Sequence, residues 1–409
     1  MKLCFGGRFF SNTVRNGSSL STVAELNKHV ASLPDLIEDK KQVIDLMMQY
    51  KQFATKFQSR ESISPAGVNK LNKSFVPFVD RLENAEISKS LEYFARMDGN
   101  PPMPLLTSIK GRLNTEVVSF SPTECSNSFW ALGKIRNPVE EEVIRSIEEN
   151  ILKKYKAYGS NSVAKSYWAF ARLRRIPSSE ILNVLESQLL KLGRSLKAQE
   201  ISNILWAYGT LGIHPSDEYL NFFEQQICLK IKQFKSQEVA NSLWGFAKMN
   251  HTPSKDVLGV LESQLLKLGR SMKAQEISNI LWAYGTLGIH QSDEYLNFFE
   301  QQICLKIKQF KSQEVAISLW AFAKMNHTPP KDVLGVLESQ LFKLGRSMKA
   351  QDISNILWAH GTLGIRPSDE YLNLLVTRAY SLADEMDAKD KALLIISISK
   401  LESFMIEKP

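Results

Sequence analysis

Two columns of basic residues recur along the chain at intervals of 38 residues, and their chemistry suits contacts with a polyanion. The first column consists of Lys156, Arg194, Lys232, Arg270, Lys308 and Arg346, and the second of Lys197, Lys235, Lys273, Lys311 and Lys349. Stacked modules would place these cations along one edge, where they can contact the phosphates of a nucleic acid. The alternative is that cations near a helix C-terminus offset its macrodipole, which explains one column more easily than two.

Phosphate contacts carry no sequence information, so a sequence-selective binder needs other side chains that reach base edges. Two further columns on the same period are candidate base-reading residues, with solvated surface as the alternative for both. The amide column is Asn127, Lys165, Asn203, Asn241, Asn279, Ile317 and Asn355. The cation–threonine column is Lys134, Arg172, Thr210, Lys248, Thr286, Lys324 and Thr362.

The sequence lacks the common signatures of catalysis. It has no Walker-type loop, no HExxH, no CxxC pair and no GxSxG, and its six histidines form no nucleophile–base arrangement. His214 and His290, like His251 and His327, are copies of one loop position. We therefore expect a protein that is not an enzyme and has no cofactor, no metal site and no small-molecule substrate.

The elements that position these columns follow from the tryptophans. All seven lie 38 residues apart, from Trp130 to Trp358, without a single insertion. A fixed period of this length is typical of a solenoid whose modules share one continuous core. The sequence predicts an all-α fold, an α-solenoid of about nine 38-residue helical-hairpin repeats.

Each module reads as a helix A followed by a helix B. In one module, Ser216 begins helix A, and Ser236 is the expected N-cap of helix B. Helix B is apolar nearly all round, and its predicted exposed strip is Glu238, Asn241, Gly245 and Lys248. The acidic residues Glu200, Glu238, Glu276 and Glu314 lie in the first turn of helix B, where they suit the helix dipole.

The aromatic residues of helix B are predicted to pack between modules. We expect the tryptophans to be core residues rather than surfaces on which bases stack. The same expectation covers a second aromatic column, in which the tyrosines and the histidine would need polar partners: Phe170, Tyr208, Phe246, Tyr284, Phe322 and His360.

Alternate modules nearly coincide, because residues 185–260 match 261–336 except at five positions. Two of these differences, Asn241/Ile317 and Gly245/Ala321, fall on the predicted exposed strip. A two-module unit was therefore duplicated, and we expect its exposed surface to have changed since.

The chain divides into four predicted segments. Residues 1–33 are a disordered leader, 34–63 an N-terminal capping helix, 64–400 the solenoid and 401–409 a tail. Met1 to Ala24 contains no acidic residue but has basic residues, serines and threonines, a composition typical of an organelle transit peptide. An ordinary disordered terminus is the alternative.

Composition limits the class of protein. Hydrophobic residues make up 44% of the 409 residues, which favours a folded chain, and no apolar run is long enough to span a membrane. The net charge of +8 and a pI near 9.1 favour a polyanionic partner. Four scattered cysteines do not form a disulfide framework.

The unit from Pro253 to Ile289, PSKDVLGVLESQLLKLGRSMKAQEISNILWAYGTLGI, resembles the octotricopeptide repeat family, as does SQEVANSLWGFAKMN (Ser236 to Asn250). The resemblance covers most of residues 64–400. It implies an α-solenoid of the kind found in nuclear-encoded factors that enter chloroplasts or mitochondria and govern RNA stability, processing or translation. Many members end in a RAP domain, which we do not expect here.

The sequence thus predicts sequence-selective binding of single-stranded RNA, about eight nucleotides if each module contacts one base. The expected setting is post-transcriptional gene expression, including translation regulation and RNA processing, in a chloroplast or mitochondrion. The alternative is a protein-interaction scaffold, since similar solenoids bind proteins.

Overall fold

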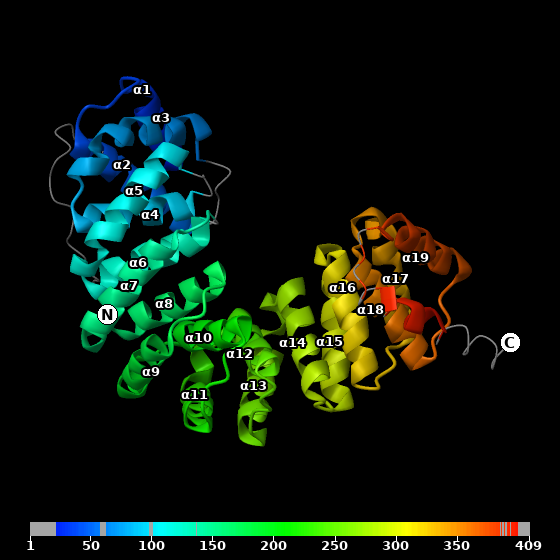
Figure 1. The fold of residues 1–409 in the computed structure, drawn as a ribbon. Helices are drawn as coiled ribbons and strands as arrows, with labels where there is room; N and C mark the ends of the chain where they lie inside the picture. Colours follow the sequence, from blue (N-terminus) through cyan, green and yellow to red (C-terminus); the bar gives the residue numbers. More distant parts are fainter. Residues whose placement is uncertain are drawn as a thin grey trace, which may run out of the picture. The chain divides into compact units, whose positions relative to one another are not determined.

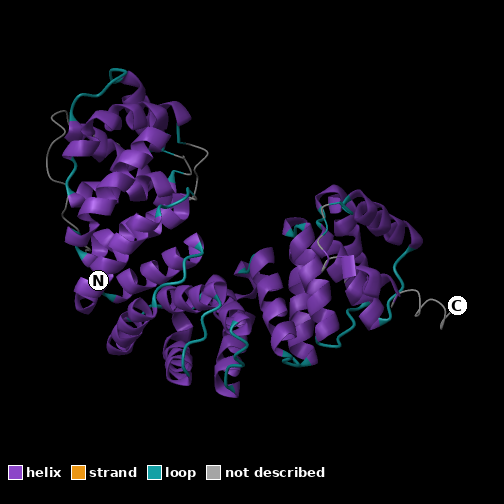
Figure 2. Ribbon diagram, in the orientation of Figure 1, coloured by secondary structure: helices purple, strands orange, loops and turns teal. Residues whose placement is uncertain are grey.

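The protein is described by a computed structural model covering residues 22–57, 63–97, 101–135, 137–384, 386, 388, 391–392 and 394–399. These residues form helices and connecting loops without a strand (Figure 2). The predicted all-α solenoid of helical repeats is confirmed. Most of the expected transit peptide and the 401–409 tail lie outside the described residues.

The chain separates into two compact units, residues 1–146 and 147–409. The first unit contains helical pairs in which α2, α4 and α6 pack on one another in sequence. Its helices are α1 (Val23–Ser32), α2 (Lys40–Phe57), α3 (Pro65–Phe75), the 3-10 helix η2 (Val76–Arg81), α4 (Asn84–Arg96), α5 (Met103–Glu116), η3 (Val117–Ser119) and α6 (Pro122–Ile135).

The predicted leader is wrong for its last ten residues or so, because they form α1. A capping box between Thr22 and Glu25 begins this helix, and Leu26 and Val30 are fully buried against α2 and α3. The capping helix expected after it is α2, which begins at Lys40 and packs in the same series as the helices B. The segment before the repeats therefore contains two helices, α1 and α2, rather than one. Each helix has an apolar side, and the two helices bury these sides against each other.

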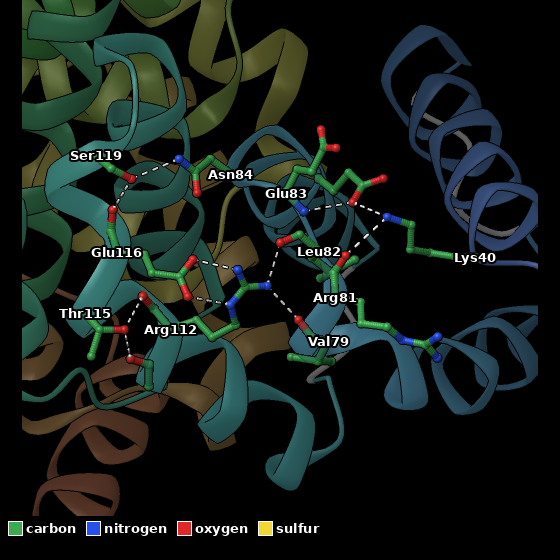
Figure 3. A network of polar contacts seen from close by, with 12 residues as sticks. Lys40, Val79, Arg81, Leu82, Glu83, Asn84, Arg112, Thr115, Glu116 and Ser119 are labelled. Carbon is green, nitrogen blue, oxygen red and sulfur yellow. Dashed lines mark hydrogen bonds and ion pairs between the residues drawn. The ribbon is translucent and has the colours of Figure 1, made fainter.

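Figure 3 shows the hydrogen bonds by which Arg112 of α5 holds the segment between α3 and α4. Its Nη1 donates to the carbonyl oxygens of Val79 and Leu82, both at 2.7 Å. Its Nε and Nη2 bond to the Glu116 carboxylate at 2.9 and 2.6 Å. The carboxylate fixes the guanidinium while the guanidinium satisfies carbonyls that the end of a helix leaves without partners.

The second unit is two layers of helices, with the helices A (α9 to α19, odd numbers) in one and the helices B (α8 to α18, even numbers) in the other. Figure 1 shows α9, α11 and α13 side by side, with α10 and α12 in the second layer. Consecutive helices B pack far more extensively than consecutive helices A. The helices are α7 (Glu141–Lys154, which begins in the first unit), α8 (Ser160–Leu173), α9 (Ser179–Leu192), α10 (Ala198–Leu211), α11 (Asp217–Lys230), α12 (Ser236–Lys248), α13 (Lys255–Leu268), α14 (Ala274–Leu287), α15 (Asp293–Lys306), α16 (Ser312–Lys324), α17 (Lys331–Leu344), α18 (Ala350–Leu363) and α19 (Asp369–Ser381).

The second aromatic column is core, as predicted, and every member is at most 1% exposed. Tyr208 and Tyr284 have the partners that burial requires, whereas His360 is hydrogen-bonded through Nδ1 and its buried Nε2 has no hydrogen bond. The Tyr208 hydroxyl lies 2.9 Å from Glu186 Oε1, and His360 Nδ1 bonds the Ile356 carbonyl at 2.9 Å. Burial raises the pKa of Glu186, although the hydrogen bond from Tyr208 opposes that rise.

Glutamines on helix A, which sequence analysis missed, bond every second module to the one before it. Nε2 of Gln188, Gln264 and Gln340 donates to the carbonyl of Tyr158, Phe234 and Phe310, respectively, at 2.8 to 2.9 Å. Each bond joins residues 30 positions apart. Arg112 to Leu82 and Arg378 to Met348 repeat this bond on the same period.

A glutamate column on helix A ties modules in the forward direction. Glu224 accepts from the backbone N–H of Ser254, 30 residues later, and from His251 Nε2 at 2.7 Å. Its copy Glu300 pairs with His327 at 2.6 Å. The duplicated loop histidines therefore join modules. The column is Glu148, Glu186, Glu224, Glu262, Glu300 and Glu338.

We expect Gln340→Leu to lower the free energy of unfolding by about 1–3 kcal/mol, because the buried Phe310 carbonyl loses its partner. Gln301→Leu on exposed surface of α15 is the matched control and should change stability by less than about 0.5 kcal/mol. Urea denaturation of both variants makes the measurement. Equal effects would show that the glutamine bond contributes nothing specific.

Candidate nucleic-acid interface

The second basic column occupies the N-cap of every helix B in the second unit from α10 onward. Lys197, Lys235, Lys273, Lys311 and Lys349 precede α10, α12, α14, α16 and α18, and all five side chains are exposed. The predicted Ser236 N-cap is wrong, because Ser236 is the first helical residue and is buried. The carboxylate of Glu238 accepts from the Lys235 backbone N–H at 3.0 Å and so satisfies the start of the helix without a serine.

The first-turn acids have the local role that was predicted for them. Glu200, Glu276 and Glu314 repeat this bond at 2.7 to 2.9 Å, and Asp352 does so at 3.0 Å. Their carboxylates are therefore engaged at the helix start and are not base-reading groups.

A lysine at an N-cap works against the helix dipole. The N-terminus of a helix carries partial positive charge, which favours an anion and disfavours a cation. N-caps also favour short side chains that accept hydrogen bonds, which lysine cannot do. Dipole compensation therefore does not account for Lys235 and its copies.

The first basic column lies in the 3-10 turns that follow helix A. Its members are exposed, and no carboxylate pairs with either column anywhere in the described part of the chain. Here the dipole argument holds, since these cations follow helix C-termini. The turns are η4 (Tyr155–Ala157), η5 (Gly193–Ser195), η6 (Ile231–Gln233), η7 (Gly269–Ser271), η8 (Ile307–Gln309) and η9 (Gly345–Ser347).

The tryptophans pack between modules, as predicted, but they are partly exposed rather than fully buried. Each is only partly buried, although its neighbours on helix B are fully buried. In the second unit their rings form a column with centroids 6.1 to 6.5 Å apart: Trp168 to Trp206, Trp206 to Trp244, Trp244 to Trp282, and Trp320 to Trp358. Helix B is apolar nearly all round, so its sequence does not show which apolar side faces out.

The cation–threonine column lies beside the tryptophan column. Lys248 Nζ lies 5.4 Å from the Trp244 ring and 4.9 Å from the Trp282 ring, a cation–π geometry. Thr210 and Thr286 differ from the prediction, because their hydroxyl oxygens are buried without a hydrogen bond rather than presented to a ligand.

The remaining members of the column are placed as follows. Arg172 lies over Trp168 at 5.6 Å and Lys324 over Trp320 and Trp358, while Thr362 is exposed. Lys134 lies in the first unit and is exposed.

The amide column is partly exposed at every member, including Lys165 and Ile317. Asn127 belongs to the first unit, and Asn203, Asn241, Asn279 and Asn355 to the second. Along α12, Asn241 is about 9 Å and Trp244 about 14 Å from the Lys235 N-cap, at 1.5 Å per residue. Basic turn, amide and tryptophan therefore succeed one another along helix B.

Gly245 does not belong to the exposed strip. It is buried where α10 and α12 meet, and a methyl group there would lie 2.5 Å from the Leu205 carbonyl oxygen. Of the two strip differences between the duplicated units, only Asn241/Ile317 therefore lies on the exposed surface. Gly245/Ala321 reflects a closer approach of two helices.

No cluster of three or more metal-binding side chains occurs among the described residues. The pKa of the Cys228 thiol is raised by burial and by Asp256 and Glu224, so the thiol stays protonated at neutral pH. Within the described chain, no helix is long and apolar enough to cross a membrane.

Comparisons with known proteins add little. No family model matches the chain, and no curated protein sequence matches it. A chain from a homology model of the full-length AP-3 complex in an intermediate open conformation is similar at 11% identity. That match covers 95% of this chain and 84% of the other, but its TM-score of 0.32 supports no argument about fold or function.

We expect Lys235→Ser, Lys273→Ser and Lys311→Ser together to stabilise the protein by about 0.5–1 kcal/mol per site, because serine caps the helix and a repelled charge is removed. The matched control replaces Lys232, Arg270 and Lys308 with serine and should not raise stability. Thermal unfolding compares the two variants. Destabilisation by the N-cap changes would mean that these lysines have a structural role.

Proposed function

We propose that this protein binds single-stranded RNA along the turns and the partly exposed face of its helices B. The observation that supports this most strongly is the column of unpaired lysines at helix N-caps. Five modules in succession keep a cation where local energetics disfavour it. A ligand that supplies one anionic group to each module would offset the unfavourable energy of a cation at each helix N-terminus.

Single-stranded nucleic acid suits the helix B face better than a duplex does. Proteins that bind single strands combine a basic track with aromatic rings on which bases stack. The partly exposed tryptophans, with Lys248 and Lys324 beside them, offer that combination. The amides of Asn203, Asn241 and Asn279 can bond the edges of unpaired bases, as helical RNA-binding repeats do.

The cellular role follows from the resemblance to octotricopeptide repeats and from the acid-free stretch Met1 to Ala24. We propose a nuclear-encoded factor of a chloroplast or mitochondrion that acts on an organellar transcript. A solenoid covering about eight nucleotides would block exonucleases or keep a ribosome entry region unpaired. Such a clamp influences RNA stability, processing or translation without chemistry of its own.

A protein-binding scaffold is the second candidate, and exposed apolar residues on the helix A layer favour it. Leu229 and Leu305 are 75% and 73% exposed, and Phe342 is 48% exposed. Exposed apolar groups of this kind mark interaction surfaces when they are contiguous. This surface lies on the other layer, so it is compatible with RNA on helix B.

The test of the proposal is selection of single-stranded RNA from a random pool by the full chain, followed by affinity measurements against salt. We expect Lys232→Gln, Arg270→Gln and Lys308→Gln together to weaken binding equally for all sequences. The slope of log affinity against log salt should fall by about 2, since each phosphate contact contributes about 0.7 for single strands.

The charge-matched control is Lys255→Gln, Lys331→Gln and Arg366→Gln, which lie at the opposite end of helix A. This control should leave the slope nearly unchanged. If both variants behave alike, only the net charge matters, and the basic columns are not the binding track.

We expect Asn241→Ile with Asn279→Ile to change the preferred base at two adjacent positions of the selected motif. The fold should survive, because Ile317 occupies the same position in the next copy. Repeating the selection with this variant makes the measurement. A uniform loss at all positions would count against base reading by the amide column.

A further inference from the structure

The tryptophan column of the second unit contains two kinds of interval. In the first kind, a lysine lies over both rings: Lys248 over Trp244 and Trp282, and Lys324 over Trp320 and Trp358, all between 4.9 and 5.6 Å. A cation in this position occupies the π surface of both rings. It also places a positive charge directly on the column.

In the second kind, a threonine stands where the lysine would be. Thr210 lies one turn after Trp206 on α10, and the Trp206 and Trp244 rings are 6.4 Å apart with planes 29° from parallel. Among the described residues, no cation lies over Trp206. Because the Thr210 hydroxyl oxygen is buried, Thr210 adds no polar group to this interval, although Lys248 lies over its second ring, Trp244.

The residue types alternate from Arg172 onward, although Arg172 lies over the Trp168 ring whereas Lys248 and Lys324 each lie over two rings. Cations occur at Arg172, Lys248 and Lys324, and threonines at Thr210, Thr286 and Thr362. The period of the face is therefore 76 residues, or two modules, although the period of the fold is 38. Duplication of a two-module unit explains how the alternation was copied.

We propose that RNA bases stack on the tryptophan column only at the threonine intervals, and that the cation intervals hold the backbone. This inference rests on the proposed RNA binding and goes further, because it makes the unit of recognition two modules and two nucleotides. A base and a cation compete for one ring face, since both need its π surface. Alternate nucleotides therefore meet chemically different sites.

The decisive variant is Thr210→Lys. Added charge predicts tighter RNA binding by this variant, whereas loss of a stacked base predicts weaker RNA binding. If charge alone matters, an added cation strengthens binding to any polyanion. If Trp206 and Trp244 hold a base, the new lysine displaces it, and RNA binding weakens by about tenfold or more. Inorganic polyphosphate, which has no bases, should bind this variant more tightly than the wild type.

The reverse variant, Lys248→Thr, is the matched control and covers the case in which Thr210→Lys fails to fold. It should weaken polyphosphate binding and lower the salt slope for RNA by about 1. It should also increase the quenching of tryptophan fluorescence by RNA, because a second stacking site opens. Circular dichroism checks that both variants keep their helices.

The outcomes separate this inference from the proposal on which it rests. Wild-type protein that binds RNA no better than polyphosphate, without quenching, contradicts RNA recognition itself. RNA binding that exceeds polyphosphate binding but tightens in Thr210→Lys overturns only the two-module inference. Weaker RNA binding together with tighter polyphosphate binding in that variant supports both.

Discussion

The packing of each helix B between the preceding and the following helix B is the constraint on which the rest of the structure depends. Phe246, Leu243 and Val239 of α12 are completely buried between α10 and α14. Each such side chain contributes about 1.5–3 kcal/mol by leaving water, and the contribution is lost if a neighbour moves. An insertion in helix B would displace both neighbours at once, which explains why the 38-residue period is unbroken from Trp130 to Trp358.

Apolar packing alone does not fix how one module is aligned along the next. The hydrogen bonds made by glutamine and glutamate side chains of helix A fix that alignment. The glutamine bonds of alternate modules reach 30 residues back, and Glu224 reaches 30 residues forward to Ser254, so such bonds join neighbouring modules in both directions. A buried carbonyl or carboxylate without its partner is costly, which makes these bonds selective for one alignment. These bonds use side chains of helix A and main-chain atoms of the turns, whereas the exposed cations of both basic columns have no carboxylate partner among the described residues.

Two kinds of residue on the exposed side of helix B are not those that would stabilise the protein most. Lysine replaces a capping side chain at the start of each helix B from α10 to α18, and tryptophan remains partly in water although it is the largest apolar residue available. Such departures from local preference are expected at functional sites. The lysine caps support the RNA proposal, because serine would satisfy these helix starts better than lysine does.

The sequence by itself determined the all-α repeat, the division of each module into two helices and the burial of the second aromatic column, because these depend on periodicity and on local start signals such as Ser216. The sequence also predicted both basic columns, and the structure confirms that their members are exposed. Only the tertiary structure decided that Trp244 faces out, that Gly245 faces the neighbouring helix and that Thr210 turns its hydroxyl inward. The reason is physical: on a helix that is apolar nearly all round, the angle at which its neighbours pack determines which side stays open, and that angle arises from contacts between modules.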